Sequence, residues 1–222
     1  MVRGLIHGWG IRDVTYQVSR TVPERWECPF YSRWRSVISR CKGSPRKSRA
    51  YDNCDVSEGF RRLTDFISWA KNEGFSEENC NIAYLDKDII ASGNKAYSPE
   101  LCAFVPPILN SSIVCFSNNT GRYPVGVIER KKRDKKTTFI TGCLMHKGKM
   151  QYLGVKETPE ECHALWQSAK LESLLLLPDE YKLFCKETGI RLHSSVIDGI
   201  LRRVDILSSD LQNKRITTTF NK

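Results

Sequence analysis

The feature that most constrains the fold is a run of alternating segments between residues 124 and 177. Three short segments, "PVGVIER", "KTTFITGCLM" and "GKMQYLG", have the composition of strands and are joined by the polar turns "KKRDKK" and "HKG". The segment that follows, "TPEECHALWQSAKLESLLLL", begins like a helix, with Thr158 as N-cap, Pro159 in the first helical position and Glu161 completing a capping box. We therefore predict a three-stranded antiparallel sheet with one helix packed on it, which leaves one sheet face free.

Two amphipathic helices are predicted ahead of this block. In "CPFYSRWRSVISRC" the arginines lie largely on faces away from an apolar stripe made of Tyr31, Trp34, Val37, Ile38 and Cys41. In "SEGFRRLTDFISWAKNEGF" a second stripe, made of Phe60, Leu63, Phe66, Ile67 and Ala70, ends before Gly74, where a helix stop is expected. The aromatic residues of both stripes are expected in the core, and the arginines of the first helix are a weaker candidate for contacts to nucleic acid.

Charge and cysteine content narrow the classes of partner and compartment. The formal net charge of +10 over 222 residues favours a polyanionic partner, because excess Lys and Arg attract phosphates without regard to sequence. No stretch has the length of a membrane helix, and "MVRGLIHGWGIRD" lacks the apolar core of a signal peptide. The nine cysteines form no CxxC pair, so reduced, buried thiols are favoured over structural zinc. We expect a cytoplasmic protein with no membrane partner.

The stretch "YLDKDIIASGNKAYSPELCAFVPPILN", residues 84–110, concentrates the polar residues of interest. Asp86 and Asp88 flank Lys87 at the end of one apolar run, and a Gly-Asn turn and a second apolar run follow. This pattern predicts a hairpin whose first strand carries the charged residues.

The order of "GWGIRD", "CPFYSRWRSVISRC", "YDNCDVSEGF" and the 84–110 stretch resembles the bacteriophage family of HNH-type homing endonucleases. The strand block that follows resembles an Apetala-type DNA-binding domain, the fold of plant ethylene-response factors. The resemblance implies an α+β fold in three parts. They are an N-terminal helical region with an HNH-like ββα-metal hairpin (1–118), an Apetala-type sheet-and-helix domain (119–177) and a C-terminal helical tail (178–222). A phage-encoded protein of this kind would act in the host cytoplasm.

The resemblance also implies a site. Asp86 falls at the position of the family's metal-binding Asp and Asn110 at that of its helical ligand, and both are oxygen donors that suit Mg²⁺ or Mn²⁺. Asp86, Lys87, Asp88 and Asn110 would then form the catalytic set of a DNA endonuclease or nickase. Two positions depart from the family, because Lys87 replaces the general-base His and Leu101 the Asn that orients it.

A lysine is protonated at neutral pH, since its unperturbed pKa is about 10.4, and an ammonium ion cannot accept a proton. Lys87 is therefore predicted to contact phosphate. Two other bases stay open: His7, on an N-terminal arm that folds back, and Asp88 acting through a bound water. For Asp88 the alternative is a loop carboxylate bonded to backbone amides.

The DNA contacts implied by the resemblance lie around the turn "ERKKRDKKTTF" and on the third strand of the sheet. The predicted residues are Arg130, Lys131, Lys132, Lys135, Lys136, Thr138 and Gln151. A solvated hairpin tip is the alternative for this charge run.

Two functions follow from these patterns: a metal-dependent endonuclease that recognises double-stranded DNA, or a DNA-binding protein without chemistry that acts in regulation or interferes with host functions. A host protein as a further partner stays open. In the tail, one apolar stripe is predicted to dock on the body or to form a homodimer; it consists of Ile197, Ile200, Leu201, Val204, Leu207 and Leu211.

Overall fold

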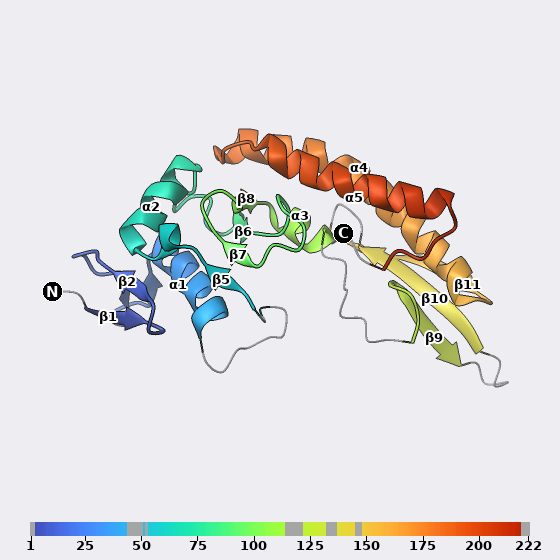
Figure 1. Ribbon diagram of the computed structural model, residues 1–222, viewed down its shortest axis with the longest axis horizontal. Helices are drawn as coiled ribbons and strands as arrows, with labels where there is room; N and C mark the ends of the chain where they lie inside the picture. Colours follow the sequence, from blue (N-terminus) through green and yellow to red (C-terminus); the bar gives the residue numbers. More distant parts are fainter. Residues whose placement is uncertain are drawn as a thin grey trace. The chain divides into compact units, whose positions relative to one another are not determined.

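The structure is a computed structural model that describes residues 3–43, 51, 53–113, 122–131, 137–144 and 148–218. It is a mixed α+β protein, as predicted, with several small sheets (Figure 1). The chain divides into two compact units. Unit 1 consists of Met1–Val105 and Phe184–His193, and unit 2 consists of Pro106–Leu183 and Ser194–Lys222. The three-part division predicted from the sequence differs from this one, since a ten-residue segment near the C-terminal end belongs to the first unit.

Unit 1 contains several pairs of very short strands. β1 (Arg3–Ile6) pairs with β2 (Gly10–Arg12), and β3 (Ser19–Arg20) with β4 (Trp26–Glu27), both antiparallel. β5 (Asp55–Val56) runs parallel to β7 (Ala96–Tyr97), which brings two distant parts of the chain together.

The core of unit 1 is built on the two predicted helices, α1 (Pro29–Lys42) and α2 (Leu63–Asn72), the second preceded by the 3-10 turn η2 (Glu58–Phe60). The predicted stripes are confirmed, with one exception, since Ile67 is only half-buried. Trp34 is fully enclosed, and its indole Nε1 donates a hydrogen bond of 2.7 Å to the Phe60 carbonyl. The predicted stop at Gly74 is also confirmed, because this residue has a φ of +78° and a Cβ there would lie 2.1 Å from the Gly189 carbonyl oxygen.

The predicted hairpin is formed by β6 (Tyr84–Asp86) and β8 (Ala103–Val105), which pair antiparallel with Asp86 opposite Ala103. The helix α3 (Pro107–Ser112) follows β8 and carries Asn110, as the resemblance implies for the helical ligand, but it belongs to unit 2.

Unit 2 contains the predicted three-stranded antiparallel sheet, in the order β11 (Met150–Lys156), β10 (Thr137–Leu144), β9 (Val127–Lys131). The long helix α4 (Pro159–Thr188) begins at the end of the sheet (Figure 1), and its Cys162 forms a small core with Val127 and Phe139. The capping box is confirmed, because the Thr158 amide donates to Glu161 Oε2 and the Glu161 amide to Thr158 Oγ1, each at 3.3 Å.

The helix α4 continues through Pro178, so it runs from the predicted sheet-and-helix domain (119–177) into the predicted tail (178–222). Leu174, Leu177 and Tyr181 form one buried stripe on both sides of the proline, and this burial outweighs the loss of a backbone donor. In α5 (Ser194–Gln212), Ile200, Val204 and Leu207 of the predicted stripe are buried, whereas Leu201 is 43% exposed. These three α5 residues are buried within a single chain, so packing on other parts of the same chain accounts for their burial. The homodimer stays a prediction.

Eight of the nine cysteines lie in the described residues, all of them free, and all but Cys80 are buried, as predicted for reduced thiols. None of the helices in the described ranges combines the length and apolar character needed to cross a bilayer.

Candidate functional site

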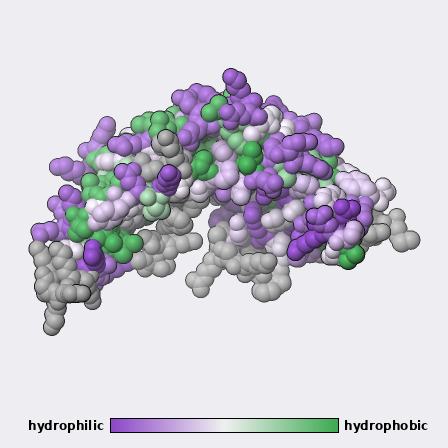
Figure 2. Space-filling view, turned by 180° about the vertical axis from the view of Figure 1, so that it is seen from behind, coloured by the Kyte–Doolittle hydropathy of each residue, from purple (hydrophilic) through white to green (hydrophobic). Residues whose placement is uncertain are grey.

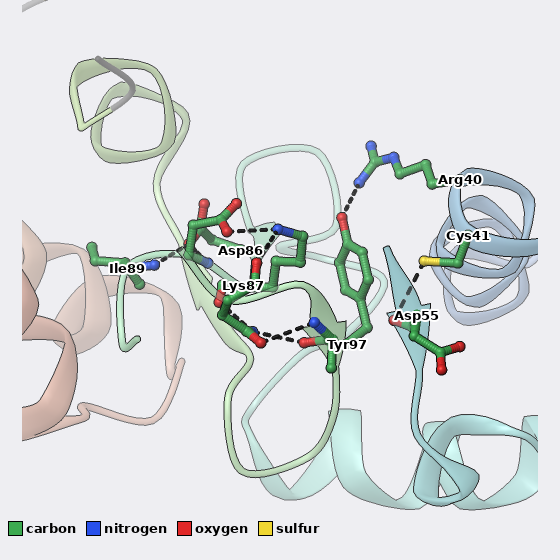
Figure 3. Close-up of polar contacts among 10 residues, drawn as sticks. Arg40, Cys41, Asp55, Asp86, Lys87, Ile89 and Tyr97 are labelled. Atoms are coloured by element: carbon green, nitrogen blue, oxygen red, sulfur yellow. Dashed lines mark hydrogen bonds and ion pairs between the residues drawn. The ribbon is translucent and has the colours of Figure 1, made fainter. Parts of the chain in front are cut away.

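Asp86 ends β6 and holds the loop that follows. Its side chain is nearly enclosed, and Oδ1 accepts hydrogen bonds from the amides of Asp88 and Ile89, each 2.8 Å long (Figure 3). A carboxylate that accepts amides two and three residues further on mimics a backbone turn. Asp86 therefore has a structural role at the start of the loop.

Lys87 closes the same loop. Its ammonium group donates to Asp88 Oδ1 at 2.6 Å and to the Asn94 carbonyl at 2.9 Å, and Nζ lies 5.8 Å from the centre of the Tyr97 ring (Figure 3). In return the Asn94 amide donates to the carbonyls of Lys87 and Ala96, at 2.8 and 2.7 Å. The Lys87 residue is only 5% exposed. Its cation is thus bonded inside the hairpin, and a phosphate would reach it only after displacing these partners.

The remaining members of the predicted catalytic set are placed differently. Asp88 has a side chain 47% exposed and lies beside Lys87. Asn110 lies half-buried on α3. Asp86 belongs to unit 1 and Asn110 to unit 2, so the predicted metal ligands are divided between the units. His7, the alternative base, lies in the turn between β1 and β2 with a φ of 49°.

The hairpin residues of unit 1, taken alone, do not fit a divalent ion. Mg²⁺ requires a shell of oxygen ligands, whereas Asp86 Oδ1 faces two N–H donors and Asp88 faces an ammonium group. Among the described residues, no group of three or more His, Cys, Asp or Glu side chains is arranged to hold a metal. The predicted Mg²⁺ or Mn²⁺ site with Asp86 and Asn110 stays a prediction.

A pair of thiols lies beside the hairpin, at the end of α1 and the start of β5. Cys41 Sγ is 3.5 Å from the Asp55 carbonyl oxygen (Figure 3). A hydrogen bond between the Cys41 and Cys54 thiols lowers the pKa of Cys54, and the positive charge of Lys87 lowers it further. The same hydrogen bond, together with burial, raises the pKa of Cys41. Cys54 is therefore the more readily ionised thiol of the pair.

The second candidate site is the face of the sheet in unit 2 that lies opposite the α4 core. Strand register assigns residues to this outer face: Arg130 pairs with Thr138, and Ile140 pairs with both Ile128 and Val155. Arg130 is exposed, which a DNA contact requires, and its role in binding stays a prediction. Thr138 is buried, however, and its hydroxyl donates to the Arg130 carbonyl at 3.3 Å, so this predicted contact has an internal bond.

A β-bulge changes which residues of β11 reach the outer face. Thr141 pairs with Gly154 but Gly142 pairs with Tyr152, which leaves Leu153 as an extra residue. Beyond the bulge the alternation is reversed, because one extra residue moves every following side chain to the other face. Gln151 consequently shares the face of its buried partner Cys143, opposite to Arg130.

The bulge brings apolar side chains to the outer face in place of Gln151. Ile128 and Tyr152 are each 64% exposed, and Met150 is 70% exposed. Sequence analysis missed Tyr152 and Met150 as surface residues of this face, although Gly154, with a φ of +126°, marks the irregular strand. Of the other predicted contacts, Lys132, Lys135 and Lys136 lie outside the described residues, as does the side chain of Lys131.

Comparisons of the chain with protein-family models, with curated proteins and with solved structures find no match. The resemblance of the motifs to phage endonucleases and Apetala-type domains therefore stays a prediction.

Proposed function

We propose that this protein binds double-stranded DNA through the outer face of the β9–β10–β11 sheet, and that the β6–β8 hairpin stabilises unit 1 without cutting DNA. The observation that carries the proposal is an antiparallel sheet face that exposes Arg130, Tyr152 and Met150, while Phe139 of the same sheet packs against α4 on the opposite face. The sequence between β9 and β10 is "KRDKK", which is rich in cations.

The chemistry of this face suits a DNA groove. A major groove about 12 Å wide admits a β-ribbon, and arginine can bond guanine edges or phosphates, while apolar side chains contact thymine methyl groups. The net charge of +10 supplies attraction to the phosphate backbone. Hydrophilic side chains predominate on the molecular face in Figure 2, with apolar residues in small separate groups. These features together favour a polyanionic partner.

The geometry of the hairpin gives no support to a cleavage step. A protonated lysine bonded to Asp88 and to a carbonyl cannot accept a proton from water, and the Asp86 oxygen that binds two amides faces donors. The alternative, a metal-dependent endonuclease or nickase, is an outcome of the second experiment below.

The binding experiment compares variants on the two faces of the sheet. Arg130→Ala and Tyr152→Ala are expected to weaken binding of a DNA duplex by about tenfold each, as for loss of a base or phosphate contact. Gln151→Ala, a matched change on the same strand as Tyr152, is expected to bind like the wild type. The measurement is a fluorescence-anisotropy titration at several salt concentrations. Equal losses in Gln151→Ala and Tyr152→Ala, or affinity that does not depend on salt, would contradict the proposal.

The cleavage experiment incubates supercoiled and linear DNA with the full chain and Mg²⁺ or Mn²⁺. We expect no product above a protein-free control. Metal-dependent nicking that disappears in both Asp86→Ala and Asn110→Ala would instead establish the nuclease. Because Asp86 caps a turn, far-ultraviolet circular dichroism of each variant must first show that it is folded.

A further inference from the structure

A cleft runs along the solvent side of α1 in unit 1, away from the helix's buried stripe. Its volume is about 650 Å³, and the residues that line it carry polar groups: His7, Tyr51 and the α1 residues Ser32, Arg35, Ser36, Ser39 and Arg40. This volume lies within the range of about 300–1,000 Å³ that is typical of sites for small ligands. Among the described residues, those that line it come from neither the sheet surface nor the hairpin.

Three hydroxyl groups point to a polar ligand. Ser32, Ser36 and Ser39 are spaced by four and three residues, which places them on one side of α1. Ser68 and Ser168, on two other helices, each bond a carbonyl of the preceding turn, at 2.9 and 3.1 Å. Within the described part of the chain, the three α1 hydroxyls make no such bond, so their donors remain available in the cleft.

Arg40 supplies a cation with no internal counterion in the described residues. Its Nη1 donates to the Tyr97 hydroxyl at 3.2 Å (Figure 3). The guanidinium lies 5.3 Å from the centre of the Tyr51 ring. The residue is half-buried, and none of the ion pairs among the described residues includes it. A partly buried guanidinium has five N–H donors and is stabilised by an anion. Arg40 is therefore prepared to hold one.

Arg35 and His7 add further hydrogen-bond donors to the cleft. Arg35 is paired with Glu27 at 3.0 Å, but its side chain is 48% exposed, so its charge is only partly offset. His7 is held at the cleft by a left-handed turn and adds a ring nitrogen. The combination of guanidinium, hydroxyl and imidazole donors matches the tetrahedral oxygens of a phosphoryl group.

We propose that the α1 cleft is a binding site for a phosphate ester, with Arg40 as its anchor and Ser36 and Ser39 as hydroxyl donors. Tyr97 acts as a positioning residue, because its hydroxyl fixes the Arg40 guanidinium from behind the cleft. The phosphate can come from a free nucleotide or from a nucleic-acid strand, and the chemistry of recognition is the same for both. The site lies in unit 1 and does not rest on DNA binding by the sheet.

The test is isothermal titration calorimetry of the full chain with pyrophosphate, adenosine monophosphate and a single-stranded oligonucleotide. Saturable binding of pyrophosphate is expected. Tighter binding of the mononucleotide would identify a nucleotide site, and tighter binding of the oligonucleotide alone a strand-backbone site. Arg40→Met is expected to weaken the pyrophosphate interaction by about tenfold, since a charge-assisted contact is lost. Lys42→Met is the matched control, since it removes one cation from the same helix without touching the cleft.

A second variant keeps the test valid if Arg40→Met is unstable. Ser36→Ala combined with Ser39→Ala favours the helix and removes two donors, so weaker pyrophosphate binding in a fully folded protein is expected. Arg130→Ala should leave pyrophosphate binding unchanged, which separates this site from the sheet. No saturable binding of any of the three probes, or wild-type affinity in both cleft variants, would overturn the proposal.

Discussion

Replacing Lys87 with methionine distinguishes a structural lysine from a phosphate contact. Methionine keeps the apolar stem in the buried space and removes the ammonium group. Two hydrogen bonds are lost, one to Asp88 and one to the Asn94 carbonyl, at 2.6 and 2.9 Å in the wild type. The loop between β6 and β7 would keep the hydrogen bonds that Asp86 and the Asn94 amide make.

The loss of stability expected for Lys87→Met depends on how well water can replace the ammonium group at Asp88 and at the Asn94 carbonyl. The bond to Asp88 is worth only about 0–1 kcal/mol, because that carboxylate is half-exposed and regains water. The Asn94 carbonyl is partly buried, and leaving it without a donor costs about 1–3 kcal/mol. Relief from burying a cation offsets part of this loss. We expect the free energy of unfolding of unit 1 to fall by about 2 kcal/mol.

The assay combines urea unfolding with amide hydrogen exchange, because exchange reports on the hairpin separately from the rest of the chain. The amides of Asp88, Ile89 and Ala96 should exchange faster in Lys87→Met, since all three close this loop. Lys95→Met is the matched control: it removes an exposed lysine from the same loop and should change stability by less than about 0.5 kcal/mol. If Lys87→Met is as stable as this control and yet binds DNA more weakly, the ammonium group contacts phosphate and the reasoning is refuted.

Three further predictions concern stability and thiol chemistry. Burial lowers the pKa of His163, so the unfolded chain binds a proton more readily than the folded one, and unit 2 should lose stability as pH falls below about 6.5. His163→Gln should remove this component of acid unfolding, which is measured by tryptophan fluorescence. Cys54 should react with iodoacetamide in its thiolate form at a pH below the usual cysteine pKa of about 8.5. The midpoint of the pH dependence of this reaction should rise in Lys87→Met, and an unchanged midpoint would exclude an effect of the Lys87 charge. Gly126→Ala should lower the free energy of unfolding in urea by about 2–5 kcal/mol, because φ is +80° and the new Cβ would lie 2.3 Å from an indole carbon of Trp166. Gly148→Ala is the control, since it has the cost of a positive φ without such a close contact. Equal losses in the two variants would show that the Trp166 contact is relieved.

Much of the fold was predictable because short-range patterns determine it. The capping box of Thr158 and Glu161 involves residues three apart, and the buried stripe around Trp34 needs only the helical period. The three strands of the sheet are separated by turns whose composition marks them. Each of these features depends on neighbours along the chain, so the sequence contains the necessary information.

The features that were missed depend on contacts that no local pattern records. Gln151 changes face because of one unpaired residue in β11, and the cost of such a bulge is set by packing across the sheet. Lys87 was expected at the surface, and its bond to the Asn94 carbonyl requires the loop to return seven residues later. The continuation of α4 through Pro178 likewise follows from burial of Leu177 and Tyr181, which propensity alone does not predict.

The same contacts correct an argument from net charge. Lys87, Lys170 and Arg203 are each at most 5% exposed, and each donates to a backbone carbonyl, as half-buried Arg33 does to those of Cys80 and Ala83. Such cations still contribute to the field of the molecule, but their donors are directed inward and they release no counterion from DNA. Because the salt dependence of binding counts phosphates that are directly neutralised, its slope must be well below the value implied by all 35 lysines and arginines. A steep slope would mean that these internal bonds open when DNA binds.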